Sequence, residues 1–204
     1  MRDLERALND IQAMRSQIAL GTEFRGYGPA AFATTGVLGA LAALLQSLWI
    51  ENPTAEILAY LGLWIAIALL SAVIIGIDVV TRARRVHSGL ADEMVQSAAE
   101  QLLPAAVAGG LLTIVLVRYA PQSLWMLPGL WQIVLSLGVF AACRMLPAPL
   151  LAVGVWYLGT GLACLALASE AHALSPWAMG LPFGIGQLLT AALIYLLGLR
   201  DAEK

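Results

Sequence analysis

The sequence predicts an all-α integral membrane protein built as a bundle of six transmembrane helices. Of its 204 residues, 60% are hydrophobic and only 12% are charged, which is more apolar surface than one soluble core can bury. The mean hydropathy is +0.83, and the apolar residues gather in six segments, most of them near the roughly 20 residues that cross about 30 Å of hydrocarbon. These segments lack the alternation of barrel strands, so helices are expected. The expected spans are Pro29–Ile50, Ile57–Val79, Leu103–Val117, Leu124–Cys143, Leu150–Ala168 and Trp177–Leu199.

Residues 1–27 precede the first span and are expected to form a cytoplasmic amphipathic helix. Apolar residues recur there at three- and four-residue spacing, with charged residues on the other faces. The mixed charges argue against a purely electrostatic membrane anchor, so the helix is expected to lie in the interface or to dock on a partner. The charged start is unlike a cleaved signal peptide, and the first span is expected to act as its own insertion signal. The apolar stripe consists of Leu4, Leu8, Ile11, Met14 and Ile18.

The distribution of Lys and Arg predicts the orientation. All of these residues except Arg118 fall before the first span or after an even-numbered span. The positive-inside rule therefore places both termini of this multi-pass protein in the cytoplasm. The basic residues on the cytoplasmic side are Arg2, Arg6, Arg15, Arg25, Arg82, Arg84, Arg85, Arg144, Arg200 and Lys204.

Residues 28–204 are expected to form one transmembrane domain, interrupted by a cytoplasmic amphipathic linker at 81–102. The linker opens with Arg82, Arg84 and Arg85, which are candidates for contact with anionic lipid headgroups. An apolar line then runs opposite several acidic residues, as on an amphipathic helix. Pro104 predicts a kink or a new helix start where the chain enters the third span.

The spans admit a description as three helical hairpins of the same orientation. The second helix of each hairpin opens on a related motif: Gly62-Leu63-Trp64, Gly129-Leu130-Trp131 and Gly180-Leu181-Pro182. One interpretation is a triplicated hairpin, a parallel repeat of the kind that membrane proteins often contain. The other is that Gly and Trp are common near membrane ends, where Trp sits at headgroup level.

Two glutamines stand inside otherwise apolar spans. Across membrane helices a buried amide needs hydrogen-bond partners, and such bonds contribute about 1 kcal/mol. Gln132 and Gln187 are therefore interpreted first as interhelical contacts. The alternative is a central polar pocket, which they would line together with Thr160, Tyr157 and Thr190.

The last span carries Gly180, Pro182 and Gly184. Gly180 and Gly184 have the spacing that lets helix backbones approach closely, and Pro182 between them frees a carbonyl. Close packing is the first interpretation, and a broken helix with a ligand at its kink is the second.

The remaining polar residues give no catalytic or metal-binding set. Asp78 has Arg82 four residues later, which is an ion-pair spacing on a helix. Cys143 and Cys164 are expected at different depths, beyond disulfide reach. Metalloprotease, P-loop and hydrolase-elbow motifs are missing, and nothing favours nucleic-acid binding. No enzymatic activity, cofactor or metal is expected.

The segments LPGLWQIVLSLGVFAACRMLP and LSPWAMGLPFGIGQLLTAALIYLLG resemble those of small bacterial inner-membrane proteins with an N-terminal charged helix and about six spans. The resemblance covers mainly residues 1–50 and 120–198. It implies the fold and the bacterial inner-membrane location, and it carries no activity with it.

Two functions remain open from the sequence. The leading hypothesis is a non-enzymatic accessory or regulatory subunit whose cytoplasmic amphipathic helices engage a membrane or cytoplasmic protein partner, or a second copy in a homo-oligomer. The alternative is a small carrier or channel for a neutral or weakly polar solute, using the polar pocket around Gln132 and Gln187.

Overall fold

The computed structural model describes residues 28–86, 91–142, 147–167 and 174–202. Within these ranges the chain is helical and contains no strand. The prediction of six helices long and apolar enough to cross a membrane is confirmed. The helix expected within residues 1–27 lies outside the described residues. The six helices are α2 (Pro29–Trp49), α3 (Ile57–Val86), α4 (Ala91–Tyr119), α5 (Leu127–Ala141), α6 (Leu151–Leu167) and α7 (Pro176–Ala202).

Two short 3₁₀ helices lengthen the spans that contain α5 and α6. Alone, the 15 residues of α5 would reach only about 22 Å at 1.5 Å per residue. The 3₁₀ helix η1 (Pro121–Met126) leads directly into α5, and together they make a span of 21 residues. The 3₁₀ helix η3 (Ala148–Leu150) extends α6 in the same way, to 20 residues.

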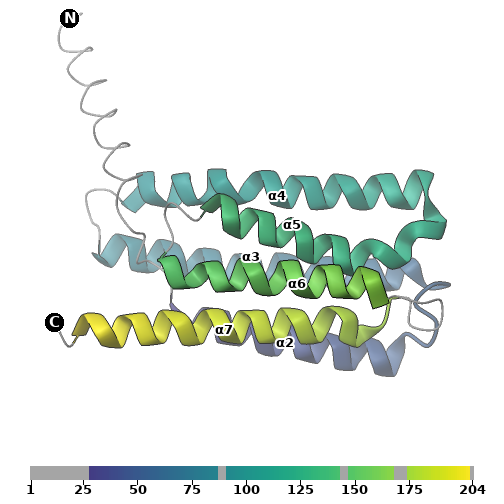
Figure 1. The fold of residues 1–204 in the computed structure, drawn as a ribbon, viewed down its shortest axis with the longest axis horizontal. Helices are drawn as coiled ribbons and strands as arrows, with labels where there is room; N and C mark the ends of the chain where they lie inside the picture. The colour runs from purple at the N-terminus through teal and green to yellow at the C-terminus, as the bar shows by residue number, and fades with distance from the viewer. Residues whose placement is uncertain (1–27, 87–90, 143–146, 168–173, 203–204) are drawn as a thin grey trace, which may run out of the picture.

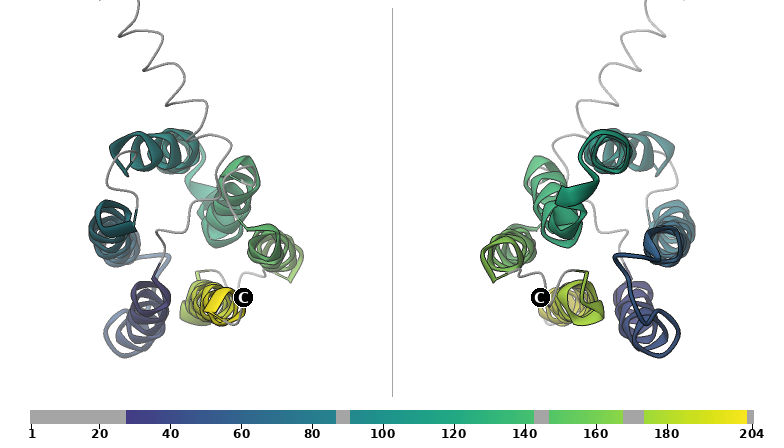
Figure 2. Two further views of the ribbon diagram at one scale, coloured as in Figure 1. Left: turned by 90° about the vertical axis from the view of Figure 1, so that its left-hand side faces the viewer. Right: turned by 90° about the vertical axis from the view of Figure 1, so that its right-hand side faces the viewer.

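The six helices run side by side (Figure 1) and follow one another around a ring in sequence order (Figure 2). Each helix contacts the next along the chain, and α7 closes the ring on α2. We call the end of the bundle that holds Trp49 the distal end and the end that holds Pro29 the proximal end. The described hairpin connections, 50–56 and η1, both lie at the distal end.

Close backbone approach marks the two most extensive helix contacts, α2 with α7 and α5 with α6. A Cβ on Gly36 of α2 would lie 3.1 Å from the carbonyl oxygen of Gly184 in α7. A Cβ on Gly161 of α6 would lie 2.8 Å from the carbonyl oxygen of Gly129 in α5. Glycine is needed at these contacts because a side chain would push the helices apart, and such small-residue contacts are the usual means of close packing in membranes.

The distal end is filled by an apolar cluster that joins the ring across its interior. Its buried members come from α2, α3, α5 and the start of the α7 segment, so residues far apart in the sequence meet there. By contrast, α3 and α4 bury a smaller share of their apolar spans than the other four helices do. In a membrane these two helices present the larger lipid-facing surface. The cluster consists of Ala42, Ala43, Tyr60, Leu61, Trp64, Leu127 and Leu174.

The linker expected at 81–102 is divided between two helices. Residues 81–86 are the end of α3, and α4 begins at Ala91 and passes through Pro104 without a break. Proline frees the carbonyl of Glu100, four residues earlier. Glu100 is exposed and precedes the apolar span, which begins at Leu102. Water can therefore hydrate this carbonyl. The lost hydrogen bond is replaced, and the helix continues through Pro104.

Candidate functional site

Gln132 of α5 hydrogen-bonds to the backbone of α7. Its Nε2 donates to the carbonyl oxygen of Ala178 over 2.9 Å. Pro182 lies four residues after Ala178 inside α7 and has no N–H, so that carbonyl lacks its usual helix donor. Gln132 supplies the missing donor from a neighbouring helix, which is one way in which membrane helices accommodate proline.

Two side chains of α6 donate to the same stretch of α7. Trp156 donates from Nε1 to the carbonyl oxygen of Pro182 over 2.9 Å. The Tyr157 hydroxyl donates to the carbonyl oxygen of Phe183 over 3.4 Å. With Gln132, these bonds hold the backbone around Pro182 from two neighbouring helices.

Gln187 links α7 to α2 and lies against α6. Its Oε1 accepts a hydrogen bond of 3.2 Å from the Thr35 hydroxyl of α2, and its side chain lies beside the Tyr157 hydroxyl. Thr35 is fully buried, and Gln187 is also buried. This amide therefore lies between three helices near the middle of the span.

Of the five residues of the predicted polar pocket, Gln187 and Tyr157 lie side by side, whereas Gln132 makes a separate contact. Gln132 bonds at Ala178, whereas Gln187 lies nine residues further along α7, about 13 Å at 1.5 Å per residue. The hydroxyl of Thr160 donates to the Trp156 carbonyl oxygen of its own helix over 2.9 Å. Thr190 bonds to the Gly186 carbonyl oxygen over 2.8 Å, also within its helix. Both glutamines thus hydrogen-bond to neighbouring helices, and the two threonine hydroxyls donate within their own.

Sequence reasoning missed Gln46, the most completely buried amide among the described residues. Its Nε2 donates to the Leu174 carbonyl oxygen over 2.8 Å, and its Oε1 accepts from Nε1 of Trp64 over 2.7 Å. Leu174 has a φ of +57°, a left-handed conformation unusual for leucine. Gln46 therefore ties α2 and α3 to the residue that leads into α7. The sequence signal that could have indicated this buried amide is the glutamine in the apolar segment LLQSLW, close to the end of a predicted span.

Three buried polar atoms lack a hydrogen-bond partner within the described part of the chain. They are the Tyr60 hydroxyl, the Ser71 hydroxyl and Oε1 of Gln132. Tyr60 and Ser71 are both buried on α3, eleven residues apart, which places them on one face of the helix because three turns of 3.6 residues bring the chain back to the same side. Burying a polar atom without a hydrogen-bond partner lowers the stability of the fold, because the atom loses its bonds to water.

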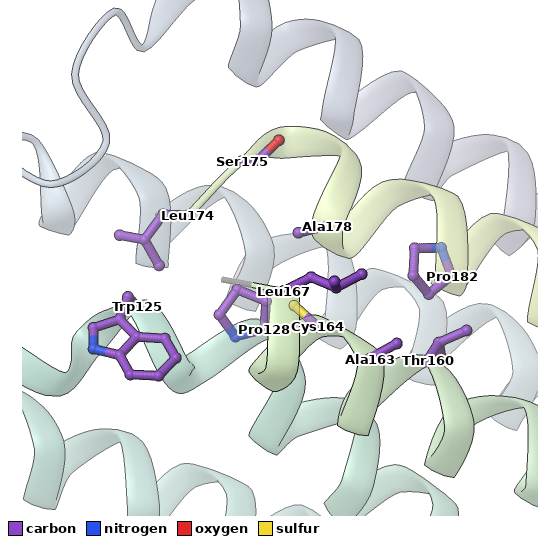
Figure 3. Close-up of a pocket in the computed structure, with 10 residues that line it drawn as sticks. All are labelled: Trp125, Pro128, Thr160, Ala163, Cys164, Leu167, Leu174, Ser175, Ala178 and Pro182. Atoms are coloured by element: carbon purple, nitrogen blue, oxygen red, sulfur yellow. The ribbon is translucent and has the colours of Figure 1, made fainter. Parts of the chain in front are cut away.

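A partly open groove lies at the distal end between α5, α6 and α7. Its volume is about 330 Å³, near the lower limit of the ~300–1,000 Å³ typical of ligand pockets. Figure 3 shows its walls, which are mostly apolar and come from the start of α5, the last turns of α6 and the first turns of α7. The residues that define its extent are Trp125, Pro128, Thr160, Cys164, Leu174 and Ala178.

At the proximal end, Asp78 of α3 holds the start of α2. One carboxylate oxygen accepts a hydrogen bond of 2.8 Å from the backbone N–H of Gly28, and the other pairs with Arg82 at 2.8 Å. The ion pair expected from their spacing is present. Arg82 and Arg84 are exposed, as contact with lipid headgroups requires, and the side chain of Arg85 lies outside the described residues.

The described residues contain no group of three or more His, Cys, Asp or Glu side chains that could hold a metal ion.

The six helices that are long and apolar enough to cross a membrane define the class of protein, a multi-pass helical membrane protein. Comparison with known proteins adds no family to it, because no family model, curated protein or solved structure matches the chain.

Proposed function

We propose that the protein is a non-enzymatic accessory or regulatory subunit of a membrane assembly, which engages its partner through helix surfaces at the proximal end. The observation that carries this proposal is the length of α4. It begins at Ala91, eleven residues before its apolar span begins at Leu102. At 1.5 Å per residue these residues extend about 16 Å beyond the span.

The chemistry of this extension suits a protein partner. Gln96 and Glu100 are exposed one turn apart, and Nε2 of Gln96 donates to the Glu100 carboxylate over 2.8 Å. Beyond this bond the Gln96 amide keeps a second N–H and the Glu100 carboxylate keeps further lone pairs, which can make directional contacts with a protein partner. We propose that this extension lies in the cytoplasm, because Arg82 and Arg84 stand at the proximal end of α3. The resemblance stated above supports a bacterial inner membrane as the location.

The carrier hypothesis is the second candidate, and the hydrogen bonds of the two glutamines weigh against it. A polar pocket for a solute needs side-chain groups that are free to bind the solute. Gln132 donates through Nε2 to the backbone carbonyl of Ala178, and Gln187 accepts from Thr35, although Oε1 of Gln132 has no partner within the described part of the chain. These partners favour a role in holding the bundle together.

We also propose that the three hairpins are repeats of one unit. Trp64 donates to Gln46, and Trp131 donates to Thr113 over 2.8 Å. In both hairpins the donor lies 18 residues after the acceptor, and both tryptophans belong to the Gly-Leu-Trp motif. In the third hairpin Pro182 stands at the tryptophan position. The equal spacing supports a common origin better than the tryptophan content alone.

Site-specific cross-linking in cells tests the proposed partner surface. A photo-cross-linking amino acid in place of Gln96 is expected to give a discrete protein adduct, whose mass separates a second copy of this chain from another protein. The matched control position is Thr54, which is exposed at the distal end. There we expect no such adduct.

A charge reversal makes the same test quantitative. Glu100→Arg is expected to lower the adduct yield at position 96 about fivefold or more, because it places the opposite charge in the contact. The control is Glu56→Arg, at an exposed distal position, which should leave the yield unchanged. An adduct yield at position 96 that Glu100→Arg leaves unchanged would contradict the proposal. Adducts with lipid alone would contradict it as well.

A further inference from the structure

The distal groove lies inside the apolar span rather than above it. It reaches from Leu167, at the end of α6, to Thr160, seven residues or about 10 Å along the helix. The span of α6 ends at Leu167, so this depth falls within the hydrocarbon of one leaflet. Two of the groove's lining residues on α6, Ala163 and Leu167, are exposed. The groove is therefore open to whatever surrounds α6, which in a bilayer is lipid.

The lining of the groove suits a hydrocarbon chain. None of its lining residues is charged, and its deep hydroxyl, on Thr160, already donates to the Trp156 carbonyl oxygen. An empty groove would leave its lining atoms without dispersion contacts. Moving an acyl chain from bulk lipid changes little in hydrophobic free energy, so occupancy depends on how well the chain packs against these walls.

Trp125 gives the groove a mouth with a polar edge. This residue lines the groove at the end away from Thr160 and Pro182 (Figure 3) and is about one-third exposed. Trp177, at the start of α7, is also exposed, and it lies in the sequence between the lining residues Ser175 and Ala178. Tryptophan favours the headgroup level, where its indole N–H can donate to lipid ester carbonyls.

We propose that the groove between α5, α6 and α7 binds one acyl chain of a membrane phospholipid, with its glycerol ester region beside Trp125. The chain packs against Pro128 and Ala178 and ends near Pro182. It fills the space beside the stretch of α7 that Gln132 and Trp156 hold through hydrogen bonds. The lipid is thus a structural component of the α6–α7 contact.

Photolabelling of the full chain in nanodiscs tests this site. The probe is phosphatidylcholine with a diazirine near the middle of one acyl chain, and adducts are mapped by mass spectrometry. We expect saturable labelling of residues 160–167 and 174–182, about fivefold above that of residues 69–73 of α3, where Leu69 and Val73 are similarly exposed. Equal labelling of both regions would overturn the proposal.

Two variants and their control show whether the groove itself is responsible. Ala163→Phe fills the groove from α6 and should reduce the labelling about fivefold. Ala178→Phe fills it from α7 and should act in the same way, which guards against a folding defect of one variant. Ala166→Phe is the control, because Ala166 is exposed on the same helix and does not line the groove. Labelling that survives both filling variants would contradict the site.

A second probe separates a phospholipid from a free fatty acid. The same diazirine chain is supplied as the free acid at equal mole fraction in unlabelled phosphatidylcholine. We expect the phospholipid to label the groove more strongly, because its ester region can reach Trp125. Selective labelling by the free acid alone would show a different ligand and overturn the assignment to phospholipid.

Discussion

The bond from Gln132 to Ala178 explains why an amide stands in an apolar helix. In the hydrocarbon region there is no water to hydrogen-bond to an unsatisfied backbone carbonyl. Pro182 creates such a carbonyl, and Gln132 satisfies it from α5. The glutamine and the proline are therefore expected to depend on each other energetically.

A double-mutant cycle measures this dependence. Relative to its effect in the Pro182→Ala background, Gln132→Leu should lower the free energy of unfolding by about 1 kcal/mol, because the Ala178 carbonyl loses its donor, whereas the unpartnered Oε1 is removed in both backgrounds. In the Pro182→Ala background the same change should cost close to nothing, because the backbone N–H at position 182 now serves that carbonyl. The measurement is unfolding by SDS titration in mixed micelles. Additive effects of the two changes would contradict the coupling.

Gln132 and Pro182 could both be identified from the sequence, but their interaction could not. Gln132 and Pro182 are each unusual in an apolar span, so each is visible in the sequence. Their meeting depends on the relative heights of α5 and α7, which no local pattern specifies. Gln46 was missed for a related reason, since a glutamine close to a helix end looks like a residue in the polar headgroup region. Its burial follows from Leu174 and Trp64, which reach it from other segments.

At the scale of the helices, small residues set the distance between α2 and α7. A Cβ on Gly180 would lie 3.3 Å from the carbonyl oxygen of Gly39 and still closer to the Ala43 methyl group. Gly198, near the other end of the same helix, has nothing within 4 Å of such a Cβ. The two glycines therefore make a matched pair for one substitution.

Alanine at these two positions should have opposite effects. Gly180→Ala should destabilise the protein by about 1–3 kcal/mol, because the added methyl group overpacks the contact. Gly198→Ala should stabilise it by about 0.5 kcal/mol, because alanine loses less backbone entropy in a helix. Both values come from the same SDS titration. A loss at Gly198 as large as that at Gly180 would show that backbone flexibility, rather than contact distance, is what matters.

The helices themselves were largely predictable, because length and hydropathy decide which segments cross a membrane. The expected first span, Pro29–Ile50, and the observed helix, Pro29–Trp49, differ by one residue. The arrangement around Pro104 was not predictable in the same way. Proline ends a helix when its freed carbonyl is left without a partner, and whether it is left so depends on where the membrane surface falls.

At the scale of the whole molecule, six spans place the start of α2 and the end of α7 on the same side of the membrane. The proposed orientation rests on the arginines, because cytoplasmic loops retain basic residues. It predicts that the connection between α2 and α3 lies outside the cell and that the beginning of α4 lies inside.

Cysteine accessibility tests this orientation. Thr54→Cys and Gln96→Cys are made separately in a chain in which Cys143 and Cys164 are replaced by serine. A membrane-impermeant maleimide should label the first variant in intact cells and the second only after permeabilisation, because α3 separates the two positions. The reverse pattern would invert the proposed orientation, and labelling of both from outside would contradict the number of spans.

The closure of the ring between α2 and α7 has a consequence for biogenesis. The ribosome delivers α2 before α7, so α2 waits for its main partner until the four spans between them have been inserted. During that time Thr35 and Gly36 face lipid or an insertion chaperone instead of Gln187 and Gly184. A nascent chain that stops short of α7 would keep this surface uncovered, in a form that membrane quality-control proteases can tell from the finished protein.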